Sequence, residues 1–323
     1  MTFGRKAYHK HFSHTISKAM ETLPGFLYPK INPMNTLHIN NLNLTYKNGL
    51  QAINDISLKI ENGMFGLLGP NGAGKSSLMK TIVGLQKPTS GTILFNEINV
   101  SENPDYIKQN LGYLPQDFGV YPKVSAYDLL QHISILKGIA NSSERKNQIL
   151  NLLEKVNLTN FKNKEVHTFS GGMRQRFGVA QALLGNPKII IVDEPTAGLD
   201  PEERNRFNSL LNEISNDMIV ILSTHLVEDV RNLCSEVAII NQGKLLRQGN
   251  PNELVTELKN KIWSKPIGKD ELESYKSQHT IISQQLIERE LHITAFSEQQ
   301  LAGYSSVHPS LEHVYFHTLT QKP

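Results

Sequence analysis

The chain has 323 residues, which is long enough for a well-buried core and for two or three domains. Hydrophobic residues make up 39% and charged residues 20% of it, an ordinary globular composition that excludes collagen-like, disulfide-rich and wholly disordered classes. The formal net charge of +3 is too small to indicate nucleic-acid binding, and we expect no nucleic-acid partner. A single cysteine, Cys234, excludes a disulfide within this sequence and a cysteine-based zinc cluster.

Residues 1–33 differ from the rest, because they hold five basic residues and one acid. Apolar side chains recur at three- and four-residue spacing from Tyr8 to Leu23, a basic amphipathic pattern that prolines interrupt from Pro24 onward. Two interpretations stay open: a helix that rests on anionic lipid or a membrane partner, or a disordered tail ahead of a start at Met34. The stretch lacks the continuous apolar run of a secretory signal.

Three early segments alternate apolar and polar residues as β-strands do: 37–39, 42–46 and 55–60. Two continuous apolar runs, 64–68 and 189–192, suit central strands of a parallel sheet that is covered on both faces. Between them, helical periodicity over about 126–186 predicts a helical insert. The longest apolar runs hold about five residues, far short of the roughly 20 that a membrane-spanning helix needs.

The pattern G-x-x-x-x-G-K-[ST] lies between an expected strand and an expected helix. It consists of Gly69, Pro70, Asn71, Gly72, Ala73, Gly74, Lys75 and Ser76. Glycines there let backbone N–H groups surround phosphate oxygens, and the helix N-terminus adds a positive dipole end. We expect Lys75 to reach the β- and γ-phosphates and the Ser76 hydroxyl to ligate Mg²⁺. The pattern therefore predicts a nucleotide site.

The apolar run 189–192 ends in two adjacent carboxylates, Asp193 and Glu194. We expect Asp193 to hold Mg²⁺, directly or through water, and Glu194 to polarise an attacking water as general base. A structural Asp-Glu pair at a strand end is the alternative. The guanine-reading pattern N-K-x-D is missing from the sequence, which argues against a GTPase.

Residues 169–176, Phe-Ser-Gly-Gly-Met-Arg-Gln-Arg, resemble the signature motif of ABC-type ATPases. Phe169 and Met173 depart from the common Leu-Ser-Gly-Gly-Gln form, but the Ser-Gly-Gly core is intact. The other motifs follow the order of the family, from an aromatic residue near the end of an early strand to a histidine after the apolar stretch that ends in Ser223-Thr224. The resemblance covers about 36–252, roughly two thirds of the chain, and it implies ATP and Mg²⁺ as cofactors.

The resemblance also implies roles for individual residues. Tyr46 would stack on adenine, Gln116 would contact Mg²⁺ or the attacking water, His225 would hold the γ-phosphate and orient Glu194, and Asp200 would lie at a dimer seam. The implied catalytic residues are Glu194, His225, Gln116 and Lys75, and the implied metal-binding residues are Ser76, Gln116 and Asp193. The implied ATP-binding residues are Tyr46, Gly69, Asn71, Gly72, Ala73, Gly74, Lys75, Ser76, Ser77, Ser170, Gly171, Gly172 and Asp200.

The small residues Ser170, Gly171 and Gly172 open an expected helix, so that backbone N–H groups and a dipole end can approach an anion. In the family this anion is the γ-phosphate bound by the other protomer. The resemblance therefore implies a composite site, with a second ATPase protomer as partner and with ATP holding the pair together until hydrolysis opens it.

The expected fold is an α/β P-loop NTPase of the ABC ATPase type. It would have a RecA-like mixed-sheet core, an antiparallel β-subdomain, a helical subdomain at about 117–186 and a small C-terminal αβ extension. We expect an N-terminal extension over 1–33, the ATPase domain over 34–258 and the accessory region over 259–323. We find no internal repeat of 20–50 residues, so a single cassette is expected.

The flanks of the signature and the C-terminal tail resemble the ATPases of ABC-2-type exporters. That resemblance implies a peripheral subunit on the cytoplasmic face of the cell membrane, coupled to a separate integral membrane permease. Phe118 and Tyr121 are candidates for contact with the permease, and core packing explains them equally well. An importer ATPase and the ATPase of a membrane complex that regulates a cell-envelope activity remain alternatives. A DNA-repair type of ATPase would need a long coiled coil before Ser170, which this sequence lacks.

The smaller features of the chain favour structural interpretations. His313 and His317 have a metal-compatible spacing but no evident third ligand, so packing is favoured. Cys234 is expected to be a buried small residue. Pro309 to Glu312 has the form of a helix start, and Trp263 with the mixed-charge tail suggests an accessory domain with a regulatory or dimerising role.

Overall fold

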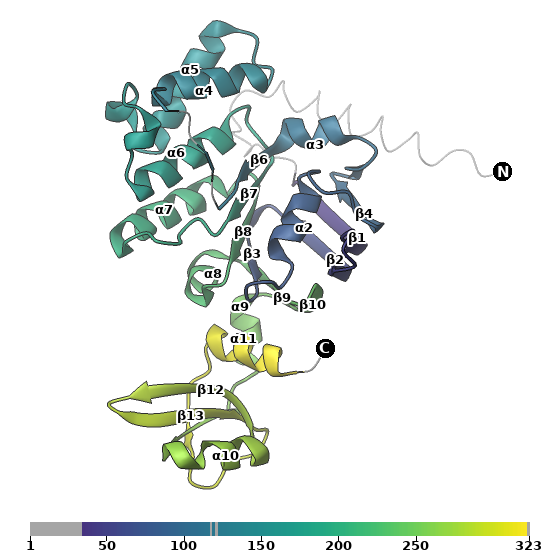
Figure 1. Ribbon diagram of the computed structural model, residues 1–323, viewed down its shortest axis with the longest axis vertical. Helices are drawn as coiled ribbons and strands as arrows, with labels where there is room; N and C mark the ends of the chain where they lie inside the picture. Colours follow the sequence, from purple (N-terminus) through teal and green to yellow (C-terminus); the bar gives the residue numbers. More distant parts are fainter. Residues whose placement is uncertain (1–33, 117, 120–121, 322–323) are drawn as a thin grey trace, which may run out of the picture. The chain divides into compact units, whose positions relative to one another are not determined.

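The computed structural model describes residues 34–116, 118–119 and 122–321 (Figure 1). The segment 1–33, with its two open interpretations, lies outside the described residues, as does Tyr121. Across the described ranges, none of the helices is long and apolar enough to cross a membrane.

A six-stranded sheet with the order β10-β9-β3-β8-β7-β6 forms the centre of the structure. Its strands are β3 (Gly63–Leu68), β6 (Leu111–Leu114), β7 (Ile189–Asp193), β8 (Ile219–Thr224), β9 (Glu236–Asn241) and β10 (Lys244–Gly249). Neighbouring strands are parallel except β9 and β10, which pair antiparallel. Every residue of β7 and β8 is buried, because helices cover both faces of the sheet. The prediction of central parallel strands is confirmed.

A second, antiparallel sheet with the order β2-β1-β4-β5 lies beside the first (Figure 1). It consists of β1 (Thr36–Thr45), β2 (Gln51–Glu61), β4 (Ser90–Phe95) and β5 (Ile98–Asn99). Leucine and isoleucine side chains from β1 and β2 share one apolar core with helix α2 (Lys75–Ile82) and strand β3. This core holds the start of α2 against the central sheet.

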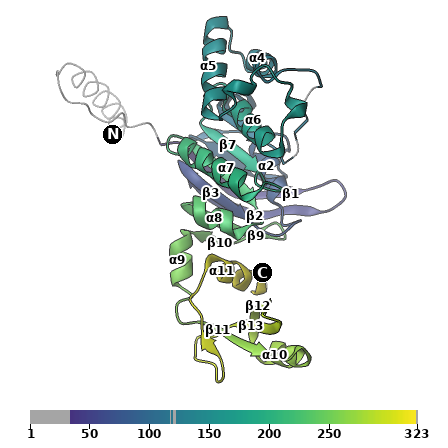
Figure 2. The same cartoon turned by 90° about the vertical axis from the view of Figure 1, so that its left-hand side faces the viewer.

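The helical part contains α3 (Pro104–Asn110), α4 (Ala126–Leu136), α5 (Ser142–Lys155), α6 (Gly171–Leu183), α7 (Pro201–Ile214) and α8 (Val227–Leu233). Ser125 caps α4 and Asn141 caps α5, since each side chain accepts a hydrogen bond from a backbone N–H in the first helical turn. The helices α4 and α5 lie at the far end of the structure from the C-terminal strands, in the interval where the insert was expected (Figures 1 and 2).

The C-terminal region begins after α9 (Pro251–Thr256) and forms a third, antiparallel sheet with the order β12-β13-β11-β14. Its elements are β11 (Ile262–Ile267), α10 (Leu272–Gln278), β12 (Thr280–Ile287), β13 (Glu290–Phe296), β14 (Ser305–Ser306) and α11 (Leu311–Thr320). Ser310 caps α11 as the sequence predicted, because its side chain accepts a hydrogen bond from His313 N. After the third sheet the chain comes back to the helices that precede it, because α11 packs against α8 and α9.

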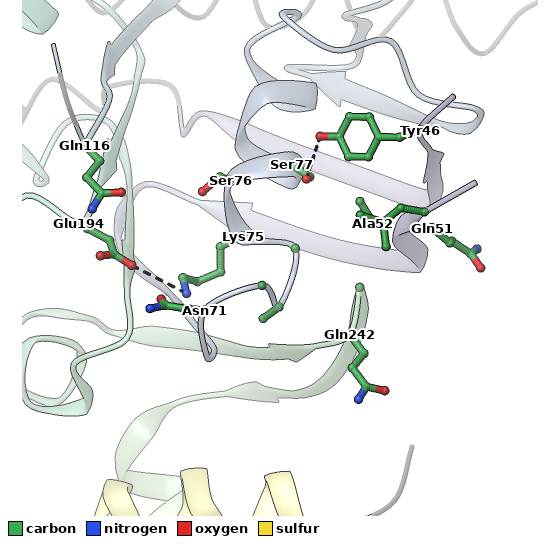
Figure 3. Close-up of a pocket in the computed structure, with 15 residues that line it drawn as sticks. Tyr46, Gln51, Ala52, Asn71, Lys75, Ser76, Ser77, Gln116, Glu194 and Gln242 are labelled. Atoms are coloured by element: carbon green, nitrogen blue, oxygen red, sulfur yellow. Dashed lines mark hydrogen bonds and ion pairs between the residues drawn. The ribbon is translucent and has the colours of Figure 1, made fainter. Parts of the chain in front are cut away.

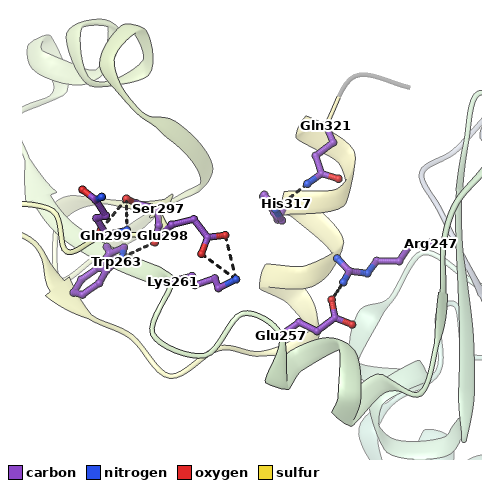
Figure 4. A network of polar contacts seen from close by, with 9 residues as sticks. All are labelled: Arg247, Glu257, Lys261, Trp263, Ser297, Glu298, Gln299, His317 and Gln321. Carbon is purple, nitrogen blue, oxygen red and sulfur yellow. Dashed lines mark hydrogen bonds and ion pairs between the residues drawn. The ribbon is translucent and has the colours of Figure 1, made fainter.

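A polar network surrounds the connection between α9 and the C-terminal sheet (Figure 4). Arg247 pairs with Glu257, and Lys261 Nζ lies 3.1 Å from Glu298 Oε2. The ring of His317 stacks on Phe296 with centroids 3.9 Å apart. Burial lowers the pKa of His317, which favours the neutral imidazole in this stack.

The remaining structural expectations concern packed side chains. His313 Nδ1 accepts a hydrogen bond from Ser310 N at 3.0 Å, so His313 and the stacked His317 both have packing roles. The described residues contain no group of three or more His, Cys, Asp or Glu side chains that could hold a metal ion. Cys234 is buried, and burial raises the pKa of its thiol. These packing interpretations of the two histidines and the cysteine are confirmed.

Candidate active site

The phosphate-binding loop connects the end of β3 to the start of α2. Gly74 stands at the N-cap of α2 with φ of 105°, in the left-handed region that favours glycine. A Cβ atom at Gly74 would lie 2.5 Å from the Ala52 carbonyl oxygen. The loop therefore needs glycine at this position both for its backbone conformation and for its close approach to β2.

The ammonium group of Lys75 is held inside the loop. Its Nζ donates hydrogen bonds to the carbonyl oxygens of Gly69 at 2.6 Å and Pro70 at 3.1 Å. It also lies 4.0 Å from Oε1 of Glu194 (Figure 3). The side chain is only 6% exposed, and burial lowers its pKa while Glu194 and Asp193 oppose that shift. A phosphate that replaced the carbonyl oxygens would bring negative charge into direct contact with this buried cation.

Two hard oxygen ligands lie together beside the loop. Ser76 Oγ donates a hydrogen bond to Asp193 Oδ2 at 3.3 Å. Burial raises the pKa of Asp193, and the hydrogen bond from Ser76 and the positive charge of Lys75 counteract the shift. A hydroxyl and a buried carboxylate fit Mg²⁺, which prefers oxygen ligands.

Glu194 follows Asp193 directly and has unusual backbone geometry. Its φ is 46°, in the left-handed region, and its backbone N donates a hydrogen bond to the carbonyl oxygen of Ser223 at 2.9 Å. Its Oε1 lies 3.2 Å from Nδ1 of His225, which follows β8. Such backbone strain in a non-glycine residue persists where surrounding contacts hold it, and it is common at functional sites.

A cavity of about 550 Å³ lies beside the phosphate-binding loop (Figure 3). The expected residues that line it are Tyr46, Asn71, Gly72, Ala73, Gly74, Lys75, Ser76, Ser77, Gln116 and Glu194. The hydroxyl of Tyr46 lies 3.0 Å from Ser77 Oγ, so the ring stands at the wall next to the start of α2. Gly69, Asp193 and His225 do not line the cavity themselves but contact residues that do.

Part of the cavity wall was missed by sequence reasoning. The additional lining residues are Leu50, Gln51, Ala52, Gln242 and Gly243. Gly243 N donates a hydrogen bond to the Ala73 carbonyl oxygen at 2.9 Å, which ties the β9–β10 turn to the phosphate-binding loop. The dipeptide Gln242-Gly243 is a turn signal, but nothing local indicates that this turn would reach the loop.

The signature residues form a separate cluster. Ser170 caps α6, with its side chain accepting from Met173 N at 3.2 Å, and Asp200 caps α7, accepting from Glu203 N at 2.9 Å. Gly172 faces Glu203 so closely that a Cβ there would lie 2.2 Å from Glu203 Oε2. Ser170, Gly171, Gly172 and Asp200 do not line the cavity of the same chain.

Comparison with known proteins identifies the family. Residues 53–197 match the family model described as ABC transporter. The chain is 35% identical over 206 residues to the ABC transporter ATP-binding protein NatA of Bacillus subtilis, a match that covers 63% of this chain and 83% of NatA. The chain belongs to the ABC transporter ATP-binding proteins. LptB of Escherichia coli, a lipopolysaccharide export system ATP-binding protein, is 31% identical to this chain over 228 residues. The match covers 69% of this chain and 94% of LptB.

A longer relative and two solved structures extend this finding. The cassette is 37% identical over 209 residues to ABC transporter A family member 8 of Dictyostelium discoideum, which is 64% of this chain but spans only 25% of that protein. The structure of cbiO1 of Clostridium perfringens, part of an ABC transporter complex, matches with a TM-score of 0.62 at 30% identity over 68% of this chain and 90% of that one. A dimeric ATP-binding cassette bound to ADP and Pi matches with a TM-score of 0.60 at 27% identity, over 66% and 98% of the two chains. The predicted family and fold class are confirmed.

Phe118 is partly buried and packs against the main apolar core. A Cβ at Gly178 of α6 would lie 3.0 Å from two ring atoms of Phe118, and the ring lies on the main apolar core. Of the two interpretations of Phe118, this contact favours core packing.

Proposed function

We propose that this cassette binds ATP with Mg²⁺, hydrolyses it as one half of a dimer, and couples the cycle to a separate integral membrane permease of an exporter. The observation that carries the proposal is the convergence of Lys75, Glu194 and His225 at one edge of the central sheet. Glu194 Oε1 lies 4.0 Å from the ammonium group and 3.2 Å from the imidazole. The carboxyl ends of parallel strands are where open α/β sheets bind ligands.

In this proposal each group has its own step. Lys75 exchanges the two loop carbonyl oxygens for β- and γ-phosphate oxygens, and Tyr46 stacks on the adenine ring. Ser76 and Asp193 hold Mg²⁺, with Gln116 at the same wall; the ion offsets phosphate charge when it is bound. Glu194 accepts the proton of the attacking water, and His225 orients the Glu194 carboxylate.

The second half of the site comes from another protomer in this proposal. Ser170, Gly171 and Gly172 lie at the start of a 13-residue helix, whose N–H groups and dipole suit an anion, yet they do not line the cavity of their own chain. A face-to-face dimer would bring them to the γ-phosphate of the partner and would place Asp200 at the seam. The similarity to a cassette solved as a dimer with ADP and Pi supports this arrangement.

The transport role and its direction rest on the relatives. LptB belongs by its name to an export system, and the flanks of the signature resemble ATPases of ABC-2-type exporters. We therefore propose a peripheral location on the cytoplasmic face of the cell membrane. An importer subunit and a complex that regulates a cell-envelope activity are the alternatives. A tagged chain recovered from detergent-solubilised membranes should carry a polytopic membrane protein, and recovery solely from the soluble fraction would contradict the permease partner.

The Glu194→Gln variant tests the ATPase itself. We expect it to retain ATP binding, to lose turnover and to elute as an ATP-dependent dimer in size-exclusion chromatography, whereas the wild type returns to its ATP-free elution position as it hydrolyses the nucleotide. Glu213→Gln is the matched control, because this carboxylate on α7 is exposed and pairs with Lys155. Undiminished hydrolysis by the Glu194→Gln variant would remove Glu194 from the role of general base.

A further inference from the structure

Asp229 is a buried carboxylate outside the ATP cavity. It lies on α8, and its side chain is 1% exposed. Its Oδ2 accepts a hydrogen bond from Thr196 Oγ1 at 2.7 Å, and its Oδ1 lies 3.4 Å from Nε of Arg204. A buried carboxylate is costly unless it is paired and hydrogen-bonded, so Asp229 depends on these two contacts.

The two contacts join three stretches of chain that meet at the site. Thr196 follows Glu194 by two residues, and Asp229 follows His225 by four. Arg204 lies in the first turns of α7, where its backbone N donates a hydrogen bond to the Asp200 carbonyl oxygen at 2.9 Å. Asp229 therefore connects three parts of the chain. They are the segment that follows Glu194, the helix α8, which follows His225, and the helix α7, which Asp200 caps.

The Glu194–His225 pair lies just beyond the last paired residues of β7 and β8. Glu194 has a strained backbone with φ of 46°, and the His225 side chain is 42% exposed, so packing around the imidazole restrains it little. Their separation of 3.2 Å thus depends on where the backbone at the end of β7 lies relative to the start of α8. The Thr196–Asp229 hydrogen bond spans the same gap at a buried position.

We propose that Asp229 is a positioning residue for ATP hydrolysis: through Thr196 and Arg204 it holds Glu194 and His225 at their working separation and ties both to the α7 helix behind Asp200. This inference rests on the proposed ATPase function. Asp229 touches neither ATP nor water in this scheme. Loss of the link affects the geometry of the chemical step, whereas the phosphate-binding loop, which binds ATP, stays in place.

The variants Asp229→Asn and Thr196→Val test the link without changing side-chain volume. A misplacement of about 1 Å can cost about a hundredfold in rate, so we expect kcat to fall about ten- to hundredfold in each variant. The KM for ATP should change by less than about twofold, since ground-state binding is retained. The control is Glu228→Gln, one residue earlier on α8, where the carboxylate is exposed and lies 3.9 Å from Arg204.

A double-mutant cycle separates positioning from general destabilisation. The double variant Asp229→Asn with His225→Ala should hydrolyse ATP no more slowly than His225→Ala alone, because both changes disable the same pair. Amide hydrogen exchange should also speed up at 194–199 in the Asp229→Asn variant and stay unchanged in the Glu228→Gln variant. Additive losses in the cycle, or unchanged kcat in the Asp229→Asn variant, would overturn the positioning role. The second outcome would leave the proposed function intact, since turnover by the wild type and its loss in Glu194→Gln test that function separately.

Discussion

The Nδ1 atom of His225 lies 3.2 Å from Oε1 of Glu194, across the boundary between two adjacent central strands. His225 follows β8 and Glu194 follows β7, so parallel pairing of the two strands brings both side chains to the same edge. The backbone N of Glu194 and the carbonyl oxygen of Ser223 extend that pairing by one hydrogen bond of 2.9 Å. The sheet itself therefore brings together the proposed base and the histidine that orients it.

We expect Lys75→Ala to weaken ATP binding at least tenfold, because the loop would lose the buried ammonium that faces the phosphates. The measurement is the dissociation constant for ATP by isothermal titration calorimetry. Lys59→Ala is the control, since Lys59 is exposed and pairs with Glu61 on β2. Equal affinity in the Lys75→Ala variant and the wild type would contradict the phosphate assignment.

Helix α11 is an integral part of the core, because Leu311 is 1% exposed and shares one apolar cluster with Val230 and Leu254. We expect Leu311→Ala to lower the free energy of unfolding by about 2–5 kcal/mol, as large-to-small substitutions in cores do. The control Leu286→Ala alters a side chain that is 65% exposed and should change stability by less than about 0.5 kcal/mol. Urea titrations at equilibrium measure both. Equal effects of the two substitutions would show that α11 does not depend on this packing.

The stack of His317 on Phe296 predicts a pH dependence of stability. Burial and the positive charges of Arg247 and Lys261 lower the pKa of His317 below its ordinary value of 6.5, while Glu298 opposes the shift. The neutral form of His317 is thus favoured in the folded state. Its contribution to the free energy of unfolding is present above pH 6.5. This contribution is lost as the pH falls below 6.5, because the unfolded chain then takes up the proton more readily than the folded one.

The loss of stability attributable to His317 should not exceed about 1.4 kcal/mol per pH unit, the limit for one proton. We expect unfolding free energies measured between pH 7.5 and 5.5 to fall less steeply in His317→Phe, which keeps an aromatic ring without a titratable group. Identical slopes in the variant and the wild type would remove His317 as the source.

Local sequence patterns predicted the parts of the site that local geometry creates. The glycine-rich loop lies between β3 and α2, and Asp193 and Glu194 follow a buried strand, because strand ends and helix starts are encoded by neighbouring residues. Chain order alone could not show that Asp193 and Ser76, which are 117 residues apart, would lie within hydrogen-bond distance. The motif order of the family supplied that expectation.

Contacts that depend on packing between distant elements had no local signal. The Thr196–Asp229 hydrogen bond joins residues 33 positions apart, and neither residue belongs to a motif that the sequence analysis used. The β9–β10 turn reaches the cavity because sheet order brings β9 beside β3. The packing of α11 against α8 likewise depends on the path of the chain through the C-terminal sheet. The sequence predicted only the start of α11, from its N-cap at Ser310.

In the proposed dimer, each ATP is enclosed by the loop of one protomer and the signature of the other, and subunit complementation distinguishes this arrangement from a site within one chain. We expect Lys75→Ala to disable the loop. We expect Gly172→Val to disable the signature, because the new side chain would displace Glu203 and crowd the start of α6. Each variant alone should be inactive.

Mixed in equal amounts, the two variants should regain ATPase activity, since one of the two sites in a mixed dimer combines an intact loop with an intact signature. Half of the dimers would be mixed on random exchange, and each would hold one working site, so we expect about a quarter of the wild-type rate if the sites act independently. A mixture as inactive as its components, under conditions where labelled subunits are seen to exchange, would contradict the composite site.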